Sequence, residues 1–345
     1  KFGFNSNFVQ MNQPYFNNQR GTYRFLGNRT GHSAADLLLG WLQNANRQVD
    51  FNRNYWRQHA LGAFFNDDWK ATRNLTVNLG LRWEVNQAPR DKYDRLGVYD
   101  TISEKLIIAD DKNAPATYQN LLDETGLRGL VTTAEEAGRP RSVIKTDWIN
   151  FSPRVGLAYK VNDKTVIRTG YGLFLSGDIL NNLRNSLSNQ FPFAIAQNFA
   201  GVNTDPGLVS LQTPFPDTRA TFSGTTNANG YTLNPKQSYL QSWNFTIERQ
   251  IFGNTAIEMD YRGSKGTYLQ RLYDYNQPYR TLDSYVAGEG FVRPIPAWNT
   301  LNIYHTGSNS NYNAFNASWR KRSRGGLFWR LNYSFSKSID DASQA

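Results

Sequence analysis

The sequence contains no cysteine among its 345 residues. Disulfide bonds and thiolate metal sites are therefore excluded. It also lacks any run of about 18 apolar residues, the length that a helix needs to cross a membrane. A helical membrane protein is thus excluded as well. A membrane-spanning β-barrel is not, because every second residue of a barrel strand faces water.

Histidine is scarce, and no spacing in the sequence suggests a metal site or a catalytic centre. His32, His59 and His305 lie far apart, whereas a zinc site needs three or four ligands that converge. The paired carboxylates at residues 110–111 and 340–341 are better explained as solvated charge than as calcium ligands. No combination of Ser, His and Asp supports a catalytic triad. We therefore expect no catalytic residue, no metal and no cofactor, and hence no enzyme.

Acidic residues are outnumbered by basic ones, 28 to 38, so the formal net charge is +10. Such a balance permits anionic lipid or nucleic acid as a partner. The basic residues are scattered, however, and the group at residues 320–324 suits a soluble turn, so we expect no nucleic-acid partner. Residues 263–267 (Gly-Ser-Lys-Gly-Thr) lack the spacing of a phosphate loop, and we expect a turn there.

What the sequence does contain is a repeated alternation of apolar and polar residues. In the clearest stretch, Leu75, Val77, Leu79, Leu81 and Trp83 alternate with Thr76, Asn78, Gly80, Arg82 and Glu84. Successive side chains of a strand point to opposite faces, so this stretch has one apolar and one polar face. The pattern predicts strands at residues 55–70, 75–84, 150–161, 165–175, 238–251, 255–264, 311–322 and 327–337. Residues 1–9 and 21–25 are two further candidates.

Short turns join these strands in pairs, and long excursions at about residues 85–149, 176–237 and 265–310 separate the pairs. Connections of that length are uncommon in compact soluble domains. They are ordinary on the outer side of a membrane barrel, whose strands need about 9–11 residues each. Helices are expected only at residues 33–41, with Ser33 as N-cap, and at 116–126. We therefore predict an all-β fold, an antiparallel transmembrane β-barrel with long extracellular loops.

The apolar faces carry aromatic residues at two heights, with aliphatic residues between them. Trp69, Tyr159, Trp319 and Trp329 lie near the short turns, and Trp83, Trp243, Tyr261 and Phe335 lie near the long excursions. Trp and Tyr favour membrane interfaces, so two such belts indicate a lipid-facing surface. The alternative is a soluble β-sandwich, in which the same face packs into a core.

The opposite faces carry charged residues of both signs. Those expected to line a water-filled lumen are Arg82, Glu84, Arg154, Arg168, Glu258, Arg262 and Arg330, together with Lys160, Glu248, Asp260 and Arg320. Burial of so many charges in a dry core is costly. Because both signs occur, we expect pairs across neighbouring strands rather than a ring of one sign.

Several segments share a recognisable barrel pattern: Phe64-Phe65-Asn66-Asp67-Asp68-Trp69-Lys70, the stretch at 75–84, Phe151-Ser152-Pro153-Arg154-Val155-Gly156-Leu157-Ala158-Tyr159, and residues 165–172, 241–250, 261–267 and 333–341. Together, these segments resemble the barrel of Oar-like TonB-dependent receptors. The resemblance implies a barrel of about 22 strands with an N-terminal plug. On this resemblance, residues 1–345 are expected to be a partial barrel of about eight to ten of those strands, without the plug, the N-terminal domains or a TonB box.

The resemblance implies a place in the bacterial cell outer membrane and TonB-energised uptake of a scarce or large ligand, such as a siderophore, an oligosaccharide or a peptide. The implied partners are outer-membrane lipid, the missing plug and strands, the TonB system reached through the missing N-terminus, and an unknown ligand. Candidate ligand contacts are the loop aromatics Tyr93, Trp148, Phe191, Tyr275 and Trp298, which can stack on the ligand or pack the loops together. The alternatives are a structural or adhesive barrel whose loops bind surfaces, and a secreted carbohydrate-binding β-sandwich.

Overall fold

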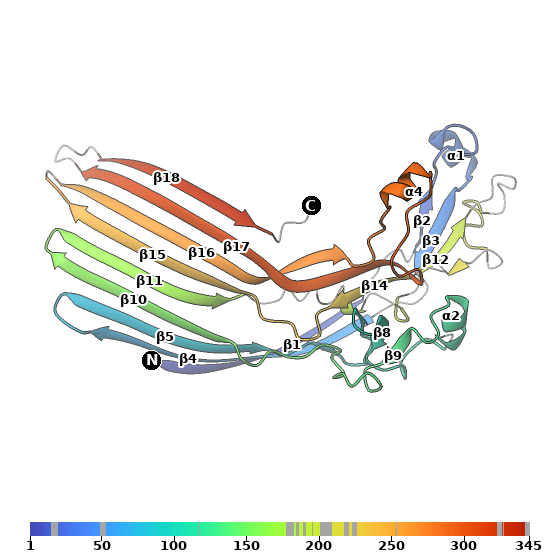
Figure 1. Ribbon diagram of the computed structural model, residues 1–345, viewed down its shortest axis with the longest axis horizontal. Helices are drawn as coiled ribbons and strands as arrows, with labels where there is room; N and C mark the ends of the chain where they lie inside the picture. Colours follow the sequence, from blue (N-terminus) through green and yellow to red (C-terminus); the bar gives the residue numbers. More distant parts are fainter. Residues whose placement is uncertain are drawn as a thin grey trace.

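The computed structural model places most of the chain in one large sheet with a folded cap at one end (Figure 1). It describes residues 1–14, 20–48, 53–116, 118–176, 183, 186–188, 191–194, 196–200, 209–216, 221–222, 226–252, 254–322, 326 and 328–341. No helix in this described part of the chain is long and apolar enough to cross a membrane.

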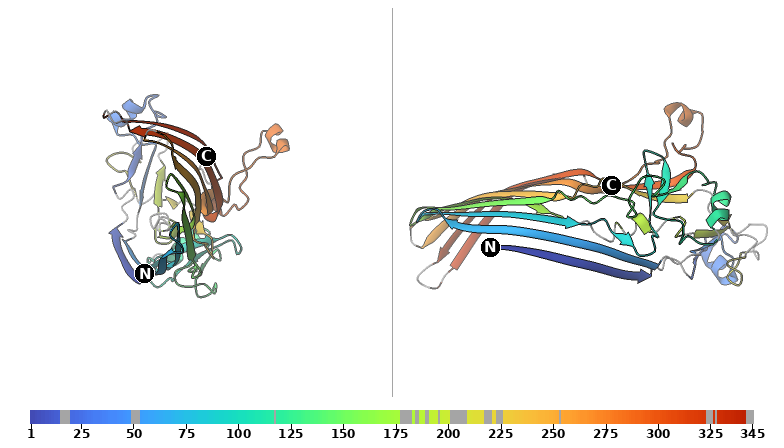
Figure 2. Two further views of the ribbon diagram at one scale, coloured as in Figure 1. Left: turned by 90° about the vertical axis from the view of Figure 1, so that its left-hand side faces the viewer. Right: turned by 90° about the horizontal axis from the view of Figure 1, so that it is seen from below.

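Nine strands form the antiparallel part of the large sheet. In spatial order they are β1 (Phe2–Pro14), β4 (Arg53–Lys70), β5 (Leu75–Asn86), β10 (Phe151–Asn162), β11 (Thr165–Leu175), β15 (Tyr239–Gln250), β16 (Thr255–Asp274), β17 (Trp298–Arg322) and β18 (Phe328–Asp340). Each pairs with the next through an antiparallel ladder. The strands form a single layer that curves into an open arc, with β1 and β18 at its two edges (Figure 2). The fold is thus the predicted antiparallel barrel architecture.

The register places the alternating side chains as the sequence predicts. Leu157 lies opposite Val77 on one neighbouring strand and opposite Thr169 on the other, and residues that face each other across a ladder share one side of the sheet. The apolar residues on this side are exposed, for example Leu157 at 39%, Ile247 at 37% and Leu331 at 62%. We call this apolar side the outer face and the opposite side the inner face. No second sheet covers the outer face in the described part of the chain, so the β-sandwich alternative is wrong (Figure 2).

The short turns lie together at one end of the sheet, which we call the short-turn end. At the predicted turn of residues 162–164, the side-chain oxygen of Asn162 accepts a hydrogen bond of 2.9 Å from the backbone N–H of Lys164. Asn is favoured in turns because its side chain can make this hydrogen bond to the backbone two residues later. The predicted turn at residues 323–326 and the predicted start of the last strand at Leu327 lie outside the described residues, except Gly326.

Some predicted boundaries are wrong, chiefly at the opposite, long-loop end. Strand β16 continues to Asp274, and β17 already begins at Trp298, so the third excursion covers residues 275–297 instead of 265–310. Residues 263–267 are therefore strand and not the predicted turn, because their backbone pairs with β15 on one side and mostly with β17 on the other. Strand β1 also runs past residue 9. The alternation fades in these extensions, which removes the signal that defined the strands.

The first excursion is folded. It contains β6 (Arg90–Asp91), β7 (Gly97–Asp100), β8 (Lys105–Ile108), α2 (Tyr118–Glu124), which confirms the predicted helix, and β9 (Val131–Thr133). Within the second excursion, β14 (Thr226–Tyr231) pairs parallel with both β17 and β7. The excursions thereby extend the large sheet beyond β17, in the order β14, β7, β8, β9.

A smaller sheet lies in the cap, built from β2 (Thr22–Arg24), β3 (Asn44–Gln48), β12 (Ala196–Ala200) and β13 (Thr221–Phe222). Helix α1 (Ser33–Leu39) confirms the helical prediction, but the predicted N-cap is wrong. His32 takes the N-cap position and makes no side-chain cap. The start of the helix is held by Asp36, whose carboxylate accepts hydrogen bonds from the N–H and hydroxyl of Thr30.

The buried apolar residues gather in the cap. The first cluster combines residues of the first and second excursions with the first residues of β17: Tyr99, Leu106, Ile108, Tyr118, Leu121, Leu122, Leu127, Phe191, Phe193, Ala228, Trp298, Leu301 and Ile303. The second surrounds Trp56 and includes Leu96, Val98, Ile107, Val143, Leu187 and Tyr231. The hydrophobic effect thus holds the excursions to one another, while the outer face of the nine strands stays uncovered.

Candidate functional site

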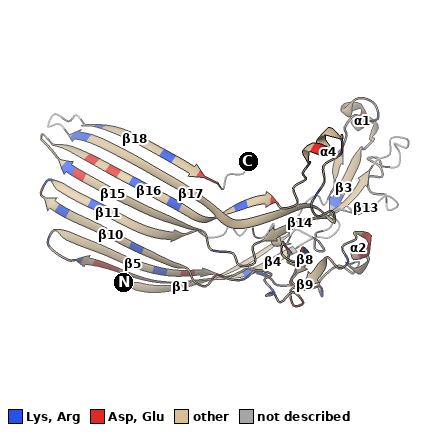
Figure 3. Cartoon of the chain, in the orientation of Figure 1, with Lys and Arg blue, Asp and Glu red and all other residues tan. Residues whose placement is uncertain are grey.

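The inner face carries every residue that the sequence places in the lumen. Arg82, Glu84, Arg154, Arg168, Glu258, Arg262 and Arg330 all lie on the side of their strands opposite the apolar residues. Figure 3 shows basic and acidic positions interleaved along the same strands.

Glu248 on β15 links three strands through its carboxylate. One oxygen lies 3.1 Å from the guanidinium of Arg168 on β11, and the other forms an ion pair with Arg320 on β17. Acidic and basic side chains therefore pair across strands, as expected from the sequence. Because Arg168 and Arg320 are about half exposed, water screens the pairs and each contributes modestly.

Asp260 on β16 is the most enclosed acid of the inner face, at 3% exposure. Its carboxylate accepts hydrogen bonds from Thr246 (2.7 Å) and Asn316 (3.2 Å), and it pairs with Arg262 on its own strand. A buried carboxylate needs such partners to remain charged. The result is a fixed polar centre that joins β15, β16 and β17.

A hollow of about 360 Å³ opens on the inner face beside this centre. It is lined by Glu258, Asp260, Arg262, Asn316, Ala317, Ser318, Arg330, Asn332, Tyr333 and Ser334. The guanidinium of Arg330 donates to the hydroxyl of Ser318 and to Asn332, both at 3.0 Å. Glu258 lies directly across the ladder from Glu248, and its carboxylate has no hydrogen-bond or ion-pair partner among the described residues.

The inner face of the earlier strands is paired more locally. Arg82 and Glu84, two residues apart on β5, lie 2.7 Å from each other. The guanidinium of Arg154 lies 4.5 Å from the ring centre of Phe174, a cation–π contact. Arg82 and Arg154 also line a second hollow with Phe64, Asn66, Leu81 and Ser152. Over most of the inner face, the charged side chains therefore have partners on the same face.

The five candidate ligand-contact aromatics fall into two groups. Phe191 and Trp298 are buried, at 3% and 0% exposure, in the first cap cluster. Trp298 packs edge-on against Tyr99, with ring centres 5.5 Å apart. These two side chains pack the excursions together, which is the alternative that the sequence left open.

The other three aromatics reach the surface. Trp148 is 49% exposed and Tyr275 is 37% exposed. Tyr93 is half-buried, with the ammonium of Lys92 5.1 Å from its ring centre and the guanidinium of Arg95 5.5 Å from it. The structure thus brings aromatic and cationic groups together at Tyr93, but it does not gather all five candidates in one site.

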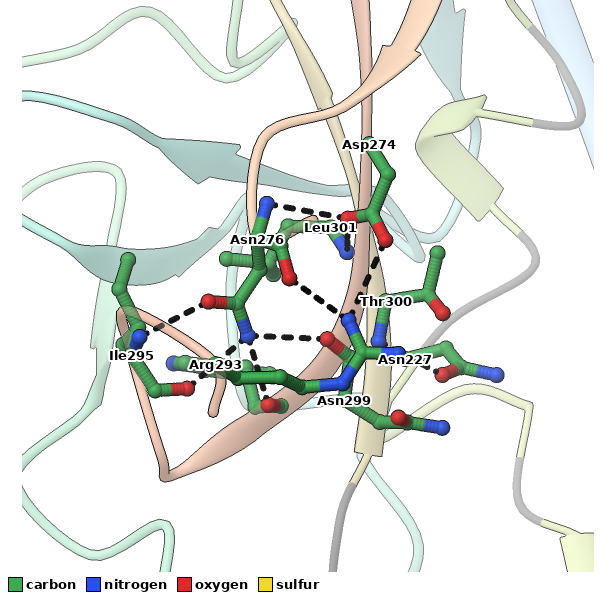
Figure 4. Close-up of polar contacts among 9 residues, drawn as sticks. Asn227, Asp274, Asn276, Arg293, Ile295, Asn299, Thr300 and Leu301 are labelled. Carbon is green, nitrogen blue, oxygen red and sulfur yellow. Dashed lines mark hydrogen bonds and ion pairs between the residues drawn. The ribbon is translucent and has the colours of Figure 1, made fainter. Parts of the chain in front are cut away.

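The third excursion is held at its base by Asn276, which is fully buried. Its amide nitrogen donates to the backbone oxygens of Ile295, Trp298 and Asn299 at 2.8–2.9 Å, and its oxygen accepts from the N–H of Ile295 (Figure 4). The neighbouring Asp274 accepts from the N–H groups of Asn276 and Leu301 and pairs with Arg293. This network fixes the point at which the excursion leaves the sheet.

Beyond this base the excursion projects from the cap and carries helix α4 (Leu282–Val286) (Figure 2). Its large apolar residues are exposed: Leu282 at 77%, Tyr285 at 66%, Val286 at 79% and Phe291 at 70%. Sequence reasoning missed this apolar surface. The sequence signal that could have indicated helix α4 is Thr281. Its hydroxyl oxygen accepts a hydrogen bond from the backbone N–H of Ser284, as expected of an N-cap residue.

The first excursion contains one well-buried ion pair. Arg139 lies 2.6 Å from Asp100, and their side chains are only 5% and 14% exposed. Burial opposes ionisation of Asp100, but hydrogen bonds from Ser103 and the charge of Arg139 outweigh it, so the pKa of Asp100 lies below its ordinary value. Burial lowers the pKa of Arg139. The pair therefore ties β7 to the later part of the same excursion.

Among the described residues, no group of three His, Asp or Glu side chains is arranged to hold a metal ion. His59, for example, packs against Phe8 with ring centres 4.5 Å apart. The inner face and the cap surface therefore remain the two candidate regions.

Several solved structures are similar to this chain. The outer membrane transporter YddB from Escherichia coli has 12% identity and a TM-score of 0.44, over 86% of this chain and 29% of that one. The siderophore receptor PirA from Pseudomonas aeruginosa has 9% identity and a TM-score of 0.35, over 88% and 48%. The FrpB iron transporter from Neisseria meningitidis has 11% identity and a TM-score of 0.32, over 86% and 40%. The chain thus spans less than half the length of each of these proteins.

No curated protein matches the sequence of this chain. A family model described as an outer membrane beta barrel domain matches all of residues 1–345. The fold that this description names agrees with the curved antiparallel sheet and the exposed apolar outer face. The chain belongs to the outer membrane beta barrel domain family and is a protein of the bacterial outer membrane.

Proposed function

We propose that this barrel is a receptor for TonB-energised uptake of a scarce or large ligand, such as a siderophore, an oligosaccharide or a peptide. The observation that carries the proposal is the inner face, where charges of both signs are held in pairs within and across strands. A polar lining of this kind is what a water-filled passage through a barrel requires. The folded cap lies at the long-loop end of that passage, where a ligand arrives from outside.

In this proposal, exposed aromatic side chains of the cap capture the ligand. Trp148 and Tyr275 offer open ring surfaces, and Tyr93 adds a ring flanked by two cations. Aromatic rings stack on sugars and peptide side chains, and cations attract anionic groups of a ligand. Phe191 and Trp298 contribute by holding the shape of the cap.

The remaining parts of the machinery lie outside residues 1–345 in this proposal. Further strands pair with the free edges of β1 and β18, because an unpaired strand edge is not tolerated in lipid. A plug domain rests against the inner face, and the TonB system moves it. The lumen residues Arg82, Glu84, Arg154, Arg168, Glu258, Arg262 and Arg330 then line the passage that opens.

The test is ligand accumulation by cells that produce the complete receptor. Labelled siderophores, oligosaccharides and peptides are supplied, and uptake is measured with and without a protonophore. We expect one ligand class to accumulate and its accumulation to stop when the proton gradient collapses. Replacing both Trp148 and Tyr275 with alanine is expected to lower ligand binding roughly 10-fold or more, while Leu331→Ala on the outer face leaves it unchanged.

Accumulation that persists without a proton gradient, or no accumulation of any ligand class, contradicts energised uptake. The second outcome favours the other candidate function, an adhesive barrel whose loops bind surfaces. The apolar projection around α4 is the observation that supports it, because exposed apolar patches mark interaction sites. An adhesive barrel predicts that deleting residues 281–291 abolishes surface binding by the cells.

A further inference from the structure

The outer face changes character at the long-loop end of β15–β18. Two cross-strand rows show the change: Gln241, Lys265, Asn311 and Ile339 in one, and Trp243, Gly263, Asn313 and Lys337 in the next. In these rows lysine and amide side chains interrupt the aliphatic and aromatic ones, of which Trp243 and Ile339 remain. We call Gln241, Tyr261, Lys265, Asn311, Asn313 and Lys337 the lysine cluster.

The lysine cluster lies at the boundary of the apolar band. On β15, outward residues run from Arg249 at the short-turn end through Ile247, Phe245 and Trp243 to Gln241. This stretch matches the about 9–11 residues that a tilted strand needs to cross the hydrocarbon core. Since the long loops of a membrane barrel lie outside the cell, the cluster is at the height of the outer-leaflet headgroups.

The lysines and amides of the lysine cluster are free to act as donors. Lys265 and Lys337 are exposed and form no ion pair within the described part of the chain. The amide oxygen of Asn313 accepts from the hydroxyl of Tyr261 at 2.7 Å, and that of Gln241 accepts from the hydroxyl of Tyr171 at 3.1 Å. In both cases the amide nitrogen is left to donate elsewhere. No carboxylate belongs to either row of the cluster.

We propose that the lysine cluster binds the phosphate group of an outer-leaflet lipid. Phosphate oxygens accept charge-assisted hydrogen bonds from ammonium and amide N–H groups, which are the donors of this cluster. Lysine side chains extend along apolar surface towards the headgroups, and cations at that height attract anionic lipid. Lys265 lies opposite Asn311 and Lys337 lies opposite Asn313, on the two sides of β17. A phosphate above that strand is therefore within reach of a long lysine side chain from either side.

The short-turn end supplies a matched control. Arg249 and Lys321 also lie on the outer face, but their cross-strand neighbours are Ile257, Thr255 and Trp329 instead of amides. This pair carries the same number of positive charges at the opposite edge of the apolar band. Its removal alters the net charge as much as removal of the two lysines, but it leaves the lysine cluster intact.

The experiment compares wild-type protein, extracted from outer membranes in mild detergent, with two double variants. One carries Lys265→Gln and Lys337→Gln, and the control carries Arg249→Gln and Lys321→Gln. Each is titrated with bisphosphorylated lipid A, with dephosphorylated lipid A and with inorganic phosphate. Binding is followed by native mass spectrometry and by the shift of the thermal midpoint. Retention of the heat-sensitive, fast-migrating band in gels verifies that each variant is folded.

We expect tight binding of the phosphorylated lipid alone, reduced roughly 10-fold or more in the Lys265 and Lys337 variant and unchanged in the control. Equal binding in wild type and lysine variant overturns the proposal. So does equal binding of the dephosphorylated lipid, or saturation by inorganic phosphate at the same concentration, because the lipid is then not the occupant. If the lysine variant does not fold, the single variants Lys265→Gln and Lys337→Gln are expected to show intermediate affinities. The result is independent of the uptake proposal, since no transported ligand is involved.

Discussion

Leu157 and Asn78 lie on neighbouring strands but on opposite faces of the sheet. Leu157 lies mid-strand among apolar residues of the outer face, whereas Asn78 lies on the inner face opposite Gly156 and Asp68. An arginine therefore meets hydrocarbon at the first position, and water with a nearby carboxylate at the second. The effects of arginine at these two positions therefore distinguish a lipid-facing surface from a surface in contact with water.

We predict that Leu157→Arg destabilises the protein in lipid vesicles by about 2–4 kcal/mol, because a cation on the lipid face near the bilayer midplane is expensive. Asn78→Arg is expected to change the free energy of unfolding by less than about 1 kcal/mol. Urea titration followed by tryptophan fluorescence measures both. Equal destabilisation by the two substitutions would show that the faces do not differ in their surroundings.

The buried pair of Asp100 and Arg139 makes the cap sensitive to acid. The pKa of Asp100 is lower in the folded protein than in the unfolded chain, so the stabilisation is present above the unfolded value of about 3.9 and is lost as the pH falls through the folded value. Asp100→Asn removes the charge at every pH and leaves Arg139 buried without a counter-ion. We predict a local loss of about 3–5 kcal/mol.

Limited proteolysis of residues 97–140 between pH 7 and pH 3 checks this prediction. Wild type is expected to become more susceptible at the acidic end, and Asp100→Asn to be susceptible throughout. Asp123→Asn serves as a control, because the pair that Asp123 forms with Arg128 is largely exposed. Protection of Asp100→Asn at neutral pH equal to that of wild type would mean that the pair does not anchor the excursion.

At the scale of elements, the sequence predicts the membrane strands well and the cap poorly. Alternation along residues 75–84 or 165–175 reflects two different solvents on the two faces, so it is visible in the sequence alone. In the cap, β14 pairs parallel with both β17 and β7, and its residues (Thr-Asn-Ala-Asn-Gly-Tyr) show no alternation of apolar and polar types. Contacts between excursions far apart in sequence decide that structure, and no local pattern encodes them.

The third excursion depends on one residue at its base. Asn276 is fully buried, and its side chain supplies hydrogen bonds to three backbone oxygens and one N–H. Asn276→Ala leaves these groups without a buried partner, which we expect to cost roughly 2–3 kcal/mol of local stability. Amide hydrogen exchange of residues 275–301 is then predicted to accelerate by about 30- to 150-fold.

Asn113→Ala provides the comparison for this prediction, since Asn113 is an exposed asparagine elsewhere in the cap. In Asn113→Ala, the amide hydrogen exchange of residues 275–301 is expected to match that of wild type. Unchanged protection of residues 275–301 in Asn276→Ala would show that the excursion is held by its apolar contacts alone, such as those of Trp298 and Leu301.

At the scale of the whole molecule, the inner face could be predicted residue by residue, but its pairing could not. The sequence places Glu248, Arg168 and Arg320 on one face. Only the register of β11, β15, β16 and β17 shows that one carboxylate reaches two guanidinium groups. Likewise, Trp298 and Tyr275 look alike in the sequence, yet one is buried and the other exposed, because burial in the cap depends on how three excursions meet.

The central claim is that the outer face meets lipid and the inner face meets water. Because the chain has no cysteine, single cysteines at Asn244, Phe245, Thr246 and Ile247 on β15 can each carry a nitroxide label. In lipid bilayers, the labels at Phe245 and Ile247 are predicted to collide mainly with dissolved oxygen, and those at Asn244 and Thr246 mainly with a water-soluble nickel chelate. Accessibility that does not alternate along these four residues, or that alternates in the opposite sense, would contradict the account.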